Sequence, residues 1–471
     1  MPDARLLHLI LNDQPVRIDQ PPGLTVLEFL RDTVRLTGTK TACWEGDCGS
    51  CQVLLGESVA GGMRYDAVNS CILPLGDLAG RHLVTIEGLN GAGLNPIQRA
   101  LVECGAVQCG FCTPGLVVAL TGYLLNARSI DPPTAVAALG GNLCRCTGYG
   151  AIRVAVQELC RRFQGLAGAD RLPALIASGV LPACFATIAE RLAPLSPPDR
   201  PVTAGAVLVA GGTDLFVQRP EQMRQADCRF LSREGDLRGI AMESGWCAIG
   251  AATTVAEIRE SPLLQACCPS LREDFDLFCS PPVRRRATLA GNLVNASPSG
   301  DLIIYFLALD AVLELTDGRN SRRLRLQDFY PGYKQTAKRP DEWITRIRFQ
   351  PPGPAQRFSY EKVGKRRHLD IASVNTALSI TLAGGRIASV RLAAGGVAPV
   401  PLLLADAAAV LLGQPLTAAT VRAAATAAQR EIAPISDGRG SADYKRLLLR
   451  QLLYAHFLKL FPEAIRWKDL R

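Results

Sequence analysis

The stretch Cys43-Trp44-Glu45-Gly46-Asp47-Cys48-Gly49-Ser50-Cys51 sets the architecture of the N-terminal part of the chain. Its cysteines are spaced C-x4-C-x2-C, and a fourth cysteine, Cys71, follows. This is the plant-type spacing of a [2Fe–2S] cluster, which takes four thiolates. The glycines allow tight turns that aim backbone N–H groups at sulfur. Zinc is the alternative, but zinc ligands usually come as paired C-x2-C knuckles.

A small mixed sheet is expected around this loop, over residues 5–90. Leu6–Leu11 and Gln14–Asp19 flank an Asn12-Asp13 turn, which predicts a hairpin. Thr25 is expected to cap a helix, because Glu28 stands three positions later and completes a capping box. The cysteine loop would then lie between this helix and the next strand.

A second group of cysteines, Cys109-x2-Cys112 and Cys144-x-Cys146, lies in a stretch that is expected to be helical. Each pair falls at a predicted helix end, so the four thiolates can converge. Spacing alone leaves a zinc site open, although C-x-C is an awkward zinc knuckle and the neighbouring plant-type set favours a second cluster. Capping residues and prolines predict helices that begin near Asn95-Pro96, Thr113-Pro114, Asp131-Pro132 and Gly148-Tyr149-Gly150.

Two glycine-rich stretches in the second half indicate phosphate-binding turns. Val209-Ala210-Gly211-Gly212-Thr213-Asp214 reads as a strand that feeds a glycine turn, and such a turn presents backbone N–H groups to a phosphate. The stretch from Gly291 to Asp301 adds small hydroxyl side chains, Asn292 and an acid. Two such loops suit a dinucleotide with a pyrophosphate, and the Rossmann fingerprint G-x-G-x-x-G is absent from the sequence.

Size, charge and cysteine content restrict the class of protein. A chain of 471 residues suggests several domains, and its net charge of +9 is spread thinly. The basic runs lack interleaved aromatic residues, which favours an anionic cofactor or a partner subunit over nucleic acid. The N-terminus, Met1–Ile10, reads as a strand and lacks the features of a secretory signal, and no apolar run is long enough for a membrane span. Sixteen cysteines then argue for free thiols and a reducing cytoplasm.

Several of these motifs resemble one known family. Gln108–Gly115 and Gly141–Tyr149 look like the second [2Fe–2S] domain of the molybdenum hydroxylases, the family of xanthine dehydrogenase and aldehyde oxidase, and Cys43–Cys51 is similar to the first cluster motif of that family. Both glycine-rich stretches resemble its FAD-binding loops. The resemblance covers roughly residues 5–163 and 205–450.

The resemblance implies a multi-domain α+β fold. It comprises a plant-type ferredoxin β-grasp domain, a four-helix [2Fe–2S] domain, a vanillyl-alcohol-oxidase-type FAD-binding domain and a C-terminal α+β domain. The expected boundaries are 1–90 for the ferredoxin-like domain, 91–164 for the helical domain, 165–204 for a proline-rich linker, 205–350 for the FAD-binding domain and 351–471 for the C-terminal domain.

The resemblance also implies which residues hold the cofactors. Phe278 matches an aromatic residue beside the flavin ring, although ordinary core packing is the alternative, and Gln108 matches a residue that contacts molybdopterin on a partner. After Phe278-Cys279-Ser280 the family usually continues with polar or charged residues, whereas Pro281-Pro282 stands here, so the resemblance does not decide how nicotinamide would bind beside the flavin. The implied cluster ligands are Cys43, Cys48, Cys51, Cys71, Cys109, Cys112, Cys144 and Cys146. The implied FAD-binding residues are Leu208, Val209, Ala210, Gly211, Gly212, Thr213, Phe278, Thr288, Gly291, Asn292, Asn295, Asp301, Ile344 and Lys362.

The function implied is that of the iron–sulfur/FAD subunit of a bacterial xanthine dehydrogenase, in which electrons from molybdopterin on a large subunit pass through two [2Fe–2S] clusters to FAD and then to NAD+. No catalytic residue on this chain is expected, and the expected assembly is a heterotetramer with two copies of each chain. One alternative is an aldehyde or N-heterocycle hydroxylase that uses O2 or another acceptor. An alternative of another class is an iron–sulfur redox sensor, which would have no flavin.

Overall fold

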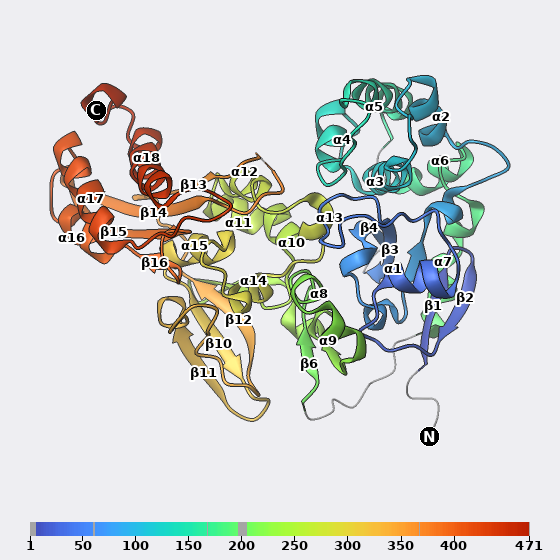
Figure 1. Ribbon diagram of the computed structural model, residues 1–471, viewed down its shortest axis with the longest axis horizontal. Helices are drawn as coiled ribbons and strands as arrows, with labels where there is room; N and C mark the ends of the chain where they lie inside the picture. The colour runs from blue at the N-terminus through green and yellow to red at the C-terminus, as the bar shows by residue number, and fades with distance from the viewer. Residues whose placement is uncertain (1–5, 60–61, 167, 196–204, 367, 471) are drawn as a thin grey trace. The chain divides into compact units, whose positions relative to one another are not determined.

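Two compact units make up the chain (Figure 1). The computed structural model describes residues 6–59, 62–166, 168–195, 205–366 and 368–470. The first unit comprises Met1–Arg233 together with Ser280–Arg286, and the second comprises Glu234–Cys279 together with Ala287–Arg471. No helix among these described residues is long and apolar enough to cross a membrane.

The first unit begins with a five-stranded sheet in the order β2-β1-β5-β3-β4. The predicted hairpin is confirmed, because β1 pairs antiparallel with β2 and the turn residue Asn12 adopts a left-handed φ of 56°, which asparagine tolerates. Met1–Arg5 lie outside the described residues. The strands are β1 (Leu7–Leu11), β2 (Gln14–Ile18), β3 (Gln52–Val59), β4 (Gly62–Asn69) and β5 (His82–Val84).

The capping box at Thr25 is also confirmed. The Thr25 Oγ1 atom accepts a hydrogen bond from the Glu28 backbone N–H at 3.3 Å, and the Glu28 carboxylate accepts one from the Thr25 N–H at 3.1 Å. The helix that follows is α-helical only in α1 (Val26–Glu28) and continues as a π-helix over Phe29–Thr33. Capping residues therefore located the start of this helix but carried no information about its widened second turn.

Four helices form the remainder of the iron–sulfur part of the first unit. They begin where the prolines and capping residues predict. Their apolar faces form one core, which includes Leu101, Leu116 and Leu159. The segment after residue 164 adds α6 (Arg171–Ala177) and α7 (Ile188–Leu192), and Leu175 is buried in the same core. The linker prediction drew on four prolines, of which Pro194 is described and Pro197, Pro198 and Pro201 lie outside the described residues. The four helices are α2 (Pro96–Glu103), α3 (Thr113–Asn126), α4 (Pro132–Ala138) and α5 (Gly150–Phe163).

The first unit also contains residues from the middle of the chain. A parallel pair, β6 (Val207–Val209) and β7 (Cys228–Phe230), is accompanied by short helices, and Val209 and Phe216 pack against Ile72 beside the plant-type cysteines. The apolar core of the cysteine loop is thus completed by residues that follow it by more than a hundred positions. The short helices are α8 (Leu215–Gln218), α9 (Pro220–Gln225) and α13 (Pro281–Arg284).

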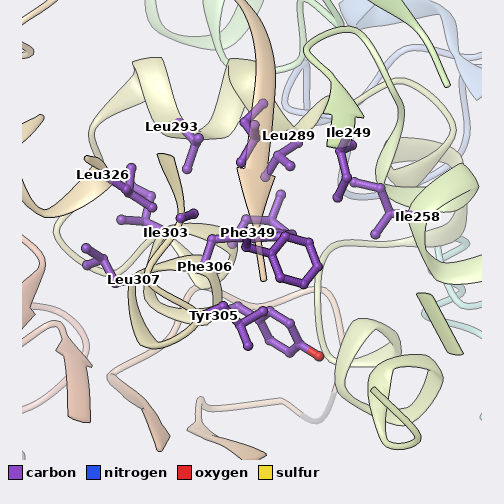
Figure 2. Close-up of a cluster of buried hydrophobic side chains, with 14 of the residues drawn as sticks. Ile249, Ile258, Leu289, Leu293, Ile303, Tyr305, Phe306, Leu307, Leu326 and Phe349 are labelled. Atoms are coloured by element: carbon purple, nitrogen blue, oxygen red, sulfur yellow. The ribbon is translucent and has the colours of Figure 1, made fainter. Parts of the chain in front are cut away.

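The second unit is built around α15 (Asp301–Ala308), whose residues from Leu302 to Ala308 are all buried. Figure 2 shows its side chains Ile303, Tyr305 and Phe306 gathered with residues of the antiparallel sheet β11-β10-β12-β9-β8. The surrounding elements are β8 (Ile240–Glu243), β9 (Trp246–Gly250), α10 (Val255–Glu260), α11 (Pro262–Cys267), α12 (Leu271–Asp276), α14 (Leu289–Asn295), β10 (Val312–Thr316), β11 (Ser321–Arg325) and β12 (Trp343–Phe349).

A second sheet, in the order β13-β14-β15-β16, separates α15 from the C-terminal helices. On its far face, the buried imidazole of His456 shares hydrogen bonds with Ser359 Oγ at 2.5 Å and Thr376 Oγ1 at 2.8 Å, which ties α18 to two strands. The elements are β13 (Gln356–Val363), β14 (Val374–Ala383), β15 (Arg386–Gly395), β16 (Leu402–Leu403), α16 (Ala405–Leu411), α17 (Ala418–Glu431) and α18 (Ala442–Leu460).

His456 should make stability fall as pH is lowered. Burial, assisted by the charge of Lys459, lowers the pKa of His456 from 6.5 to about 3. Below pH 6.5 His456 is therefore protonated in the unfolded chain but stays neutral in the folded chain. This difference lowers the free energy of unfolding by about 1.4 kcal/mol for each pH unit below 6.5. Asp274, whose pKa burial raises to about 7, acts in the opposite direction in this range. The comparison of wild type with His456→Gln by urea denaturation at pH 7.5 and 5.5 isolates the histidine contribution, and equal pH dependence in both proteins would contradict it.

Candidate functional site

The plant-type cysteines converge within the first unit. The thiol of Cys43 interacts with those of Cys48 and Cys71, and Cys51 interacts with Cys71. Cys51 and Cys71 are buried, whereas Cys43 and Cys48 are half-buried. The backbone N–H groups of Glu45 and Cys48 each donate to Cys43 Sγ at 3.4 Å. The glycine turns expected around the sulfurs are present, since Gly46 and Gly49 have φ values of 76° and 70°.

These thiols share protons within pairs. The hydrogen bond between Cys43 and Cys48 lowers the pKa of the first and raises that of the second, and the bond between Cys51 and Cys71 lowers the pKa of Cys51. The thiols whose pKa is raised, Cys48 and Cys71, hold their protons more tightly than an ordinary cysteine. Because iron binds only thiolates, filling the site must release the remaining protons, so cluster loading is expected to be favoured at higher pH.

The second cysteine set lies at the ends of the helical core. Cys146 and Cys109 are exposed and their sulfur atoms lie 3.5 Å apart, while the half-buried Cys112 interacts with Cys144. The Thr147 hydroxyl donates to Cys144 Sγ at 3.2 Å. The Phe111 backbone N–H lowers the pKa of Cys109, and burial raises that of Cys112 to about 12. One pair thus faces solvent, and the other faces the helices.

The pairwise arrangement fits two binuclear clusters better than two single ions. In the plant-type set Cys43 contacts Cys48 and Cys71, and Cys71 also contacts Cys51, while in the second set Cys109 lies beside Cys146 and Cys112 beside Cys144. A [2Fe–2S] cluster takes four thiolates, two on each iron. Across the described part of the chain, no group of three or more His, Cys, Asp or Glu side chains is arranged to hold one metal ion. All eight of these donors are thiols, and their number and spacing fit the predicted iron–sulfur clusters.

The two cysteine loops touch each other. The backbone N–H of Leu143, next to the predicted ligand Cys144, donates to the carbonyl oxygen of Cys48 at 2.9 Å. The Asn142 amide also donates to the Gly49 carbonyl at 3.3 Å. A methyl group at Gly49 would lie 2.2 Å from a backbone oxygen of the helical domain, so only glycine permits this approach. A single hydrogen bond thus joins Cys48 of the first cysteine set to Leu143, the residue before Cys144 of the second set.

The first glycine-rich stretch belongs to the first unit. Leu208 and Val209 lie in β6, and Ala210–Thr213 form the turn after it. Gly212 has a φ of 76°, and the Gly211 carbonyl accepts a hydrogen bond from Arg286 at 3.4 Å. A strand that ends in a glycine turn leaves backbone N–H groups available to an anion, as the sequence predicts.

The second stretch belongs to the second unit. Thr288 caps α14 by accepting a hydrogen bond from the Gly291 N–H at 3.1 Å, and Asn295 accepts one from Lys334. The side-chain oxygen of Asn292 is buried and has no hydrogen-bond partner among the described residues. Such an oxygen is costly unless a ligand satisfies it, which fits a polar group of FAD at this position.

Asp301 organises a buried polar network at the start of α15. One carboxylate oxygen accepts hydrogen bonds from the Tyr360 hydroxyl and the Asn375 amide, both at 2.7 Å. The other accepts one from Lys362 Nζ at 2.7 Å, and that ammonium also donates to the Leu277 carbonyl at 2.9 Å. Two predicted FAD-binding residues, Asp301 and Lys362, are thus brought together.

Two other predicted residues lie in the core of the second unit. Phe278 is only 1% exposed, and its ring centroid is 4.7 Å from Phe275 and 4.9 Å from Tyr360. Ile344 is buried within β12. Both residues therefore have a packing role, and contact of either with FAD stays a prediction.

Four family models together match most of the chain. The model described as a 2Fe-2S iron-sulfur cluster binding domain matches residues 9–75, and a second, described as a [2Fe-2S] binding domain, matches 85–157. The FAD binding domain in molybdopterin dehydrogenase matches 182–351, and the CO dehydrogenase flavoprotein C-terminal domain matches 359–460. The chain belongs to the molybdenum hydroxylase family and carries its two [2Fe–2S]-binding domains and its FAD-binding domain.

Individual proteins agree with this assignment. Xanthine dehydrogenase of Emericella nidulans is 29% identical over 87% of this chain and 35% of its own length. The chain spans about a third of the length of such curated relatives. A carbon monoxide dehydrogenase from Hydrogenophaga pseudoflava superimposes with a TM-score of 0.50 and 31% identity over 53% of this chain and 88% of that one. Quinoline 2-oxidoreductase from Pseudomonas putida 86 superimposes with a TM-score of 0.51 and 25% identity, over 55% of this chain and 91% of that one.

Sequence reasoning missed residues whose roles depend on tertiary contacts. Tyr360 and Asn375 belong to the Asp301 network, and Asn142 and Arg286 join segments distant in the chain. Asn142 lies within the Gly141–Tyr149 motif, so the signal of that motif could have pointed to it. Tyr360, Asn375 and Arg286 carry no spacing signal, because their partners come from other elements.

Proposed function

We propose that this chain transfers electrons in a xanthine-dehydrogenase-like molybdenum hydroxylase, from molybdopterin on a separate large subunit to FAD and then to NAD+. When bound, the two [2Fe–2S] clusters supply single-electron transfer and FAD supplies the exchange of two electrons with the acceptor. The observation that carries the proposal is the hydrogen bond from Leu143 N–H to the Cys48 carbonyl, because it joins the two cysteine loops within one unit.

The cysteine residues have different tasks in this proposal. Cys109 and Cys146 are exposed, so they suit the side on which electrons arrive from a partner. Cys51 and Cys71 are buried and pack in the same cluster as Val209 of the first flavin loop, so they suit the side on which electrons leave. No residue of this chain is proposed to act as an acid or base on the substrate.

The surface around the exposed cysteines is proposed to bind the molybdopterin subunit. Gln108 is exposed, and the apolar side chains Phe111 and Leu143 are 43% and 44% exposed. Exposed apolar groups beside a redox site favour a protein partner. A heterotetramer with two copies of each chain is the proposed assembly. Isolation of the native complex from its source should yield a molybdopterin-containing chain, and isolation without one would contradict the proposal.

Cofactor content gives a direct check. We expect about four irons and one FAD per chain, because two sets of four cysteines each take two irons and one FAD-binding domain is present. Metal analysis and flavin release from freshly prepared protein measure both quantities. Stoichiometric zinc, or about two irons in fully loaded protein, would contradict the two-cluster arrangement.

An aldehyde or N-heterocycle hydroxylase is the second candidate, and a structural neighbour that acts on quinoline favours it. Steady-state turnover of the assembled enzyme with xanthine, an aldehyde and an N-heterocycle, each paired with NAD+ or O2, separates the candidates. Turnover of xanthine with NAD+ alone supports the first proposal, and turnover of only the other substrates supports the second. A redox sensor without flavin is disfavoured by the FAD-binding domain.

A further inference from the structure

Arg286 is a buried guanidinium between two functional regions of the first unit. Only 7% of the residue is exposed. It forms an ion pair with Asp77, which is fully buried in the domain of the plant-type cysteines, and it donates to the Gly211 carbonyl at 3.4 Å. Arg286 therefore touches both the plant-type domain and the proposed pyrophosphate loop.

Asp77 is held in place from several directions. The Ser232 hydroxyl donates to its Oδ1 at 3.0 Å, and Arg81 lies 3.6 Å from its Oδ2. Arg233 donates to the carbonyls of the neighbouring residues Gly76 and Ala79. Burial alone would raise the pKa of Asp77, but Arg286 and the other arginines more than offset this and hold it well below its ordinary value. Asp77 is thus a fixed, ionised anchor for Arg286.

The contact with Gly211 has a stereochemical consequence. In a trans peptide the carbonyl oxygen and the following N–H point in opposite directions. Because the Gly211 oxygen is directed at Arg286, the Gly212 N–H must point away from it. Gly212 also has a φ of 76°, and its own carbonyl accepts a hydrogen bond from the Phe216 N–H at 3.1 Å, which fixes the next peptide. The orientation of the Gly212 N–H therefore depends on Arg286.

We propose that Arg286 is a positioning residue for FAD: anchored by Asp77, it turns the Gly211–Gly212 peptide so that the Gly212 N–H is presented to the pyrophosphate. The inference rests on the proposed role of Leu208–Thr213 as the pyrophosphate loop. It adds a residue from outside both glycine-rich loops to the FAD site and makes the plant-type domain a support for that site.

One guanidinium nitrogen, Nη2, makes both the ion pair with Asp77 and the hydrogen bond to Gly211. Full-length Arg286→Lys tests the role, because lysine keeps the charge beside Asp77 but its side chain is one bond shorter, so its ammonium should no longer reach Gly211. FAD is removed and rebound, and its dissociation constant and the ³¹P resonances of the bound pyrophosphate are measured. We expect about tenfold weaker binding, the range for one hydrogen bond to a charged group, and shifted ³¹P resonances. Arg285→Lys, a neighbour that pairs with Asp66 at 3.3 Å, is the control and should change neither quantity. Wild-type affinity and unshifted resonances in Arg286→Lys would overturn the proposal.

A double variant, Asp77→Leu with Arg286→Met, separates positioning from folding, because it removes both buried charges together. Its electron paramagnetic resonance spectrum should show both reduced clusters while FAD binding stays about tenfold weaker, the loss expected for one missing hydrogen bond to a charged group. Intact cluster signals with wild-type FAD affinity would overturn the role of Arg286. If the double variant fails to assemble its clusters, Arg286→Lys alone decides. Gly212→Ala tests whether Leu208–Thr213 is the pyrophosphate loop at all. If Gly212→Ala binds FAD as tightly as wild type, the loop does not hold the pyrophosphate. If Gly212→Ala binds FAD more weakly but Arg286→Lys does not, the loop assignment stands and only the role of Arg286 is refuted.

Discussion

The Cys146→Ser chain, assembled with its partner, should keep its FAD oxidised when substrate is added. Cys146 is exposed, as is its neighbour Cys109, and its loss removes a predicted ligand from the cluster proposed to receive electrons first. Changes in the outer shell of a metal site typically cost about 10- to 100-fold in affinity or activity, and loss of a ligand should cost more. Stopped-flow absorbance would show flavin reduction by substrate slowed by more than about a hundredfold on that scale.

Two comparisons make this result specific. NADH should still reduce the flavin of Cys146→Ser if NAD+ is the acceptor, because that exchange does not involve the altered cluster. Cys104→Ser changes a half-buried cysteine of the same helical domain that belongs to neither ligand set, and it should behave as wild type. Rapid flavin reduction by substrate in Cys146→Ser would refute a single path through this cluster.

Phe278→Ala should produce the other large effect. Removal of this buried ring from its contacts with Phe275 and Tyr360 should cost about 3–5 kcal/mol in the free energy of unfolding. If Phe278 also forms the wall beside the flavin, the variant should lose turnover with NAD+ and gain oxygen consumption. Urea denaturation measures the first effect, and parallel assays with NAD+ and O2 measure the second.

Phe275→Ala is the matched control, since Phe275 is equally buried in the same aromatic cluster but carries no proposed contact with FAD. It should lose similar stability and keep the acceptor preference of wild type. If both variants alter the acceptor preference equally, Phe278 acts through packing alone. If wild-type enzyme turns over fully with O2 and not with NAD+, the dehydrogenase proposal fails, while the iron–sulfur and FAD-binding domains remain.

Local signals predicted the local structure well. The hairpin at Asn12, the capping box at Thr25 and the starts of α2 and α3 depend on residues within a few positions of each other, and all are found. The eight cysteines were recognisable because metal ligands must recur at fixed spacing. The pairing of Cys109 with Cys146 was not, since it arises only when two helix ends meet.

Long-range contacts were not predicted either, because they form only when segments distant in the sequence meet in the fold. The Asp301 network needs Tyr360 and Asn375 from two strands that follow it by more than fifty residues. The sequence grouped the two glycine-rich stretches in one domain, whereas the compact units divide them, with Gly211 in the first and Gly291 in the second. Which compact unit a segment joins depends on the surfaces against which it packs, and neither the spacing of motifs nor the periodicity of apolar residues reveals those surfaces.

The segment Ser280–Arg286 belongs to the first unit although the chain has already entered the second, and this affects how the protein can fold during synthesis. As the chain leaves the ribosome, Asp77 emerges about two hundred residues before its buried counter-charge, Arg286. Domains usually fold as they are synthesised, N-terminal first. Until that segment is made, Asp77 has Arg81 at 3.6 Å but lacks its closer ion-pair partner Arg286, so burying this carboxylate in the iron–sulfur unit is less well compensated. A gene cut after Arg233 would encode both sets of cysteine ligands, yet its product would lack the charge that completes the unit built to hold them.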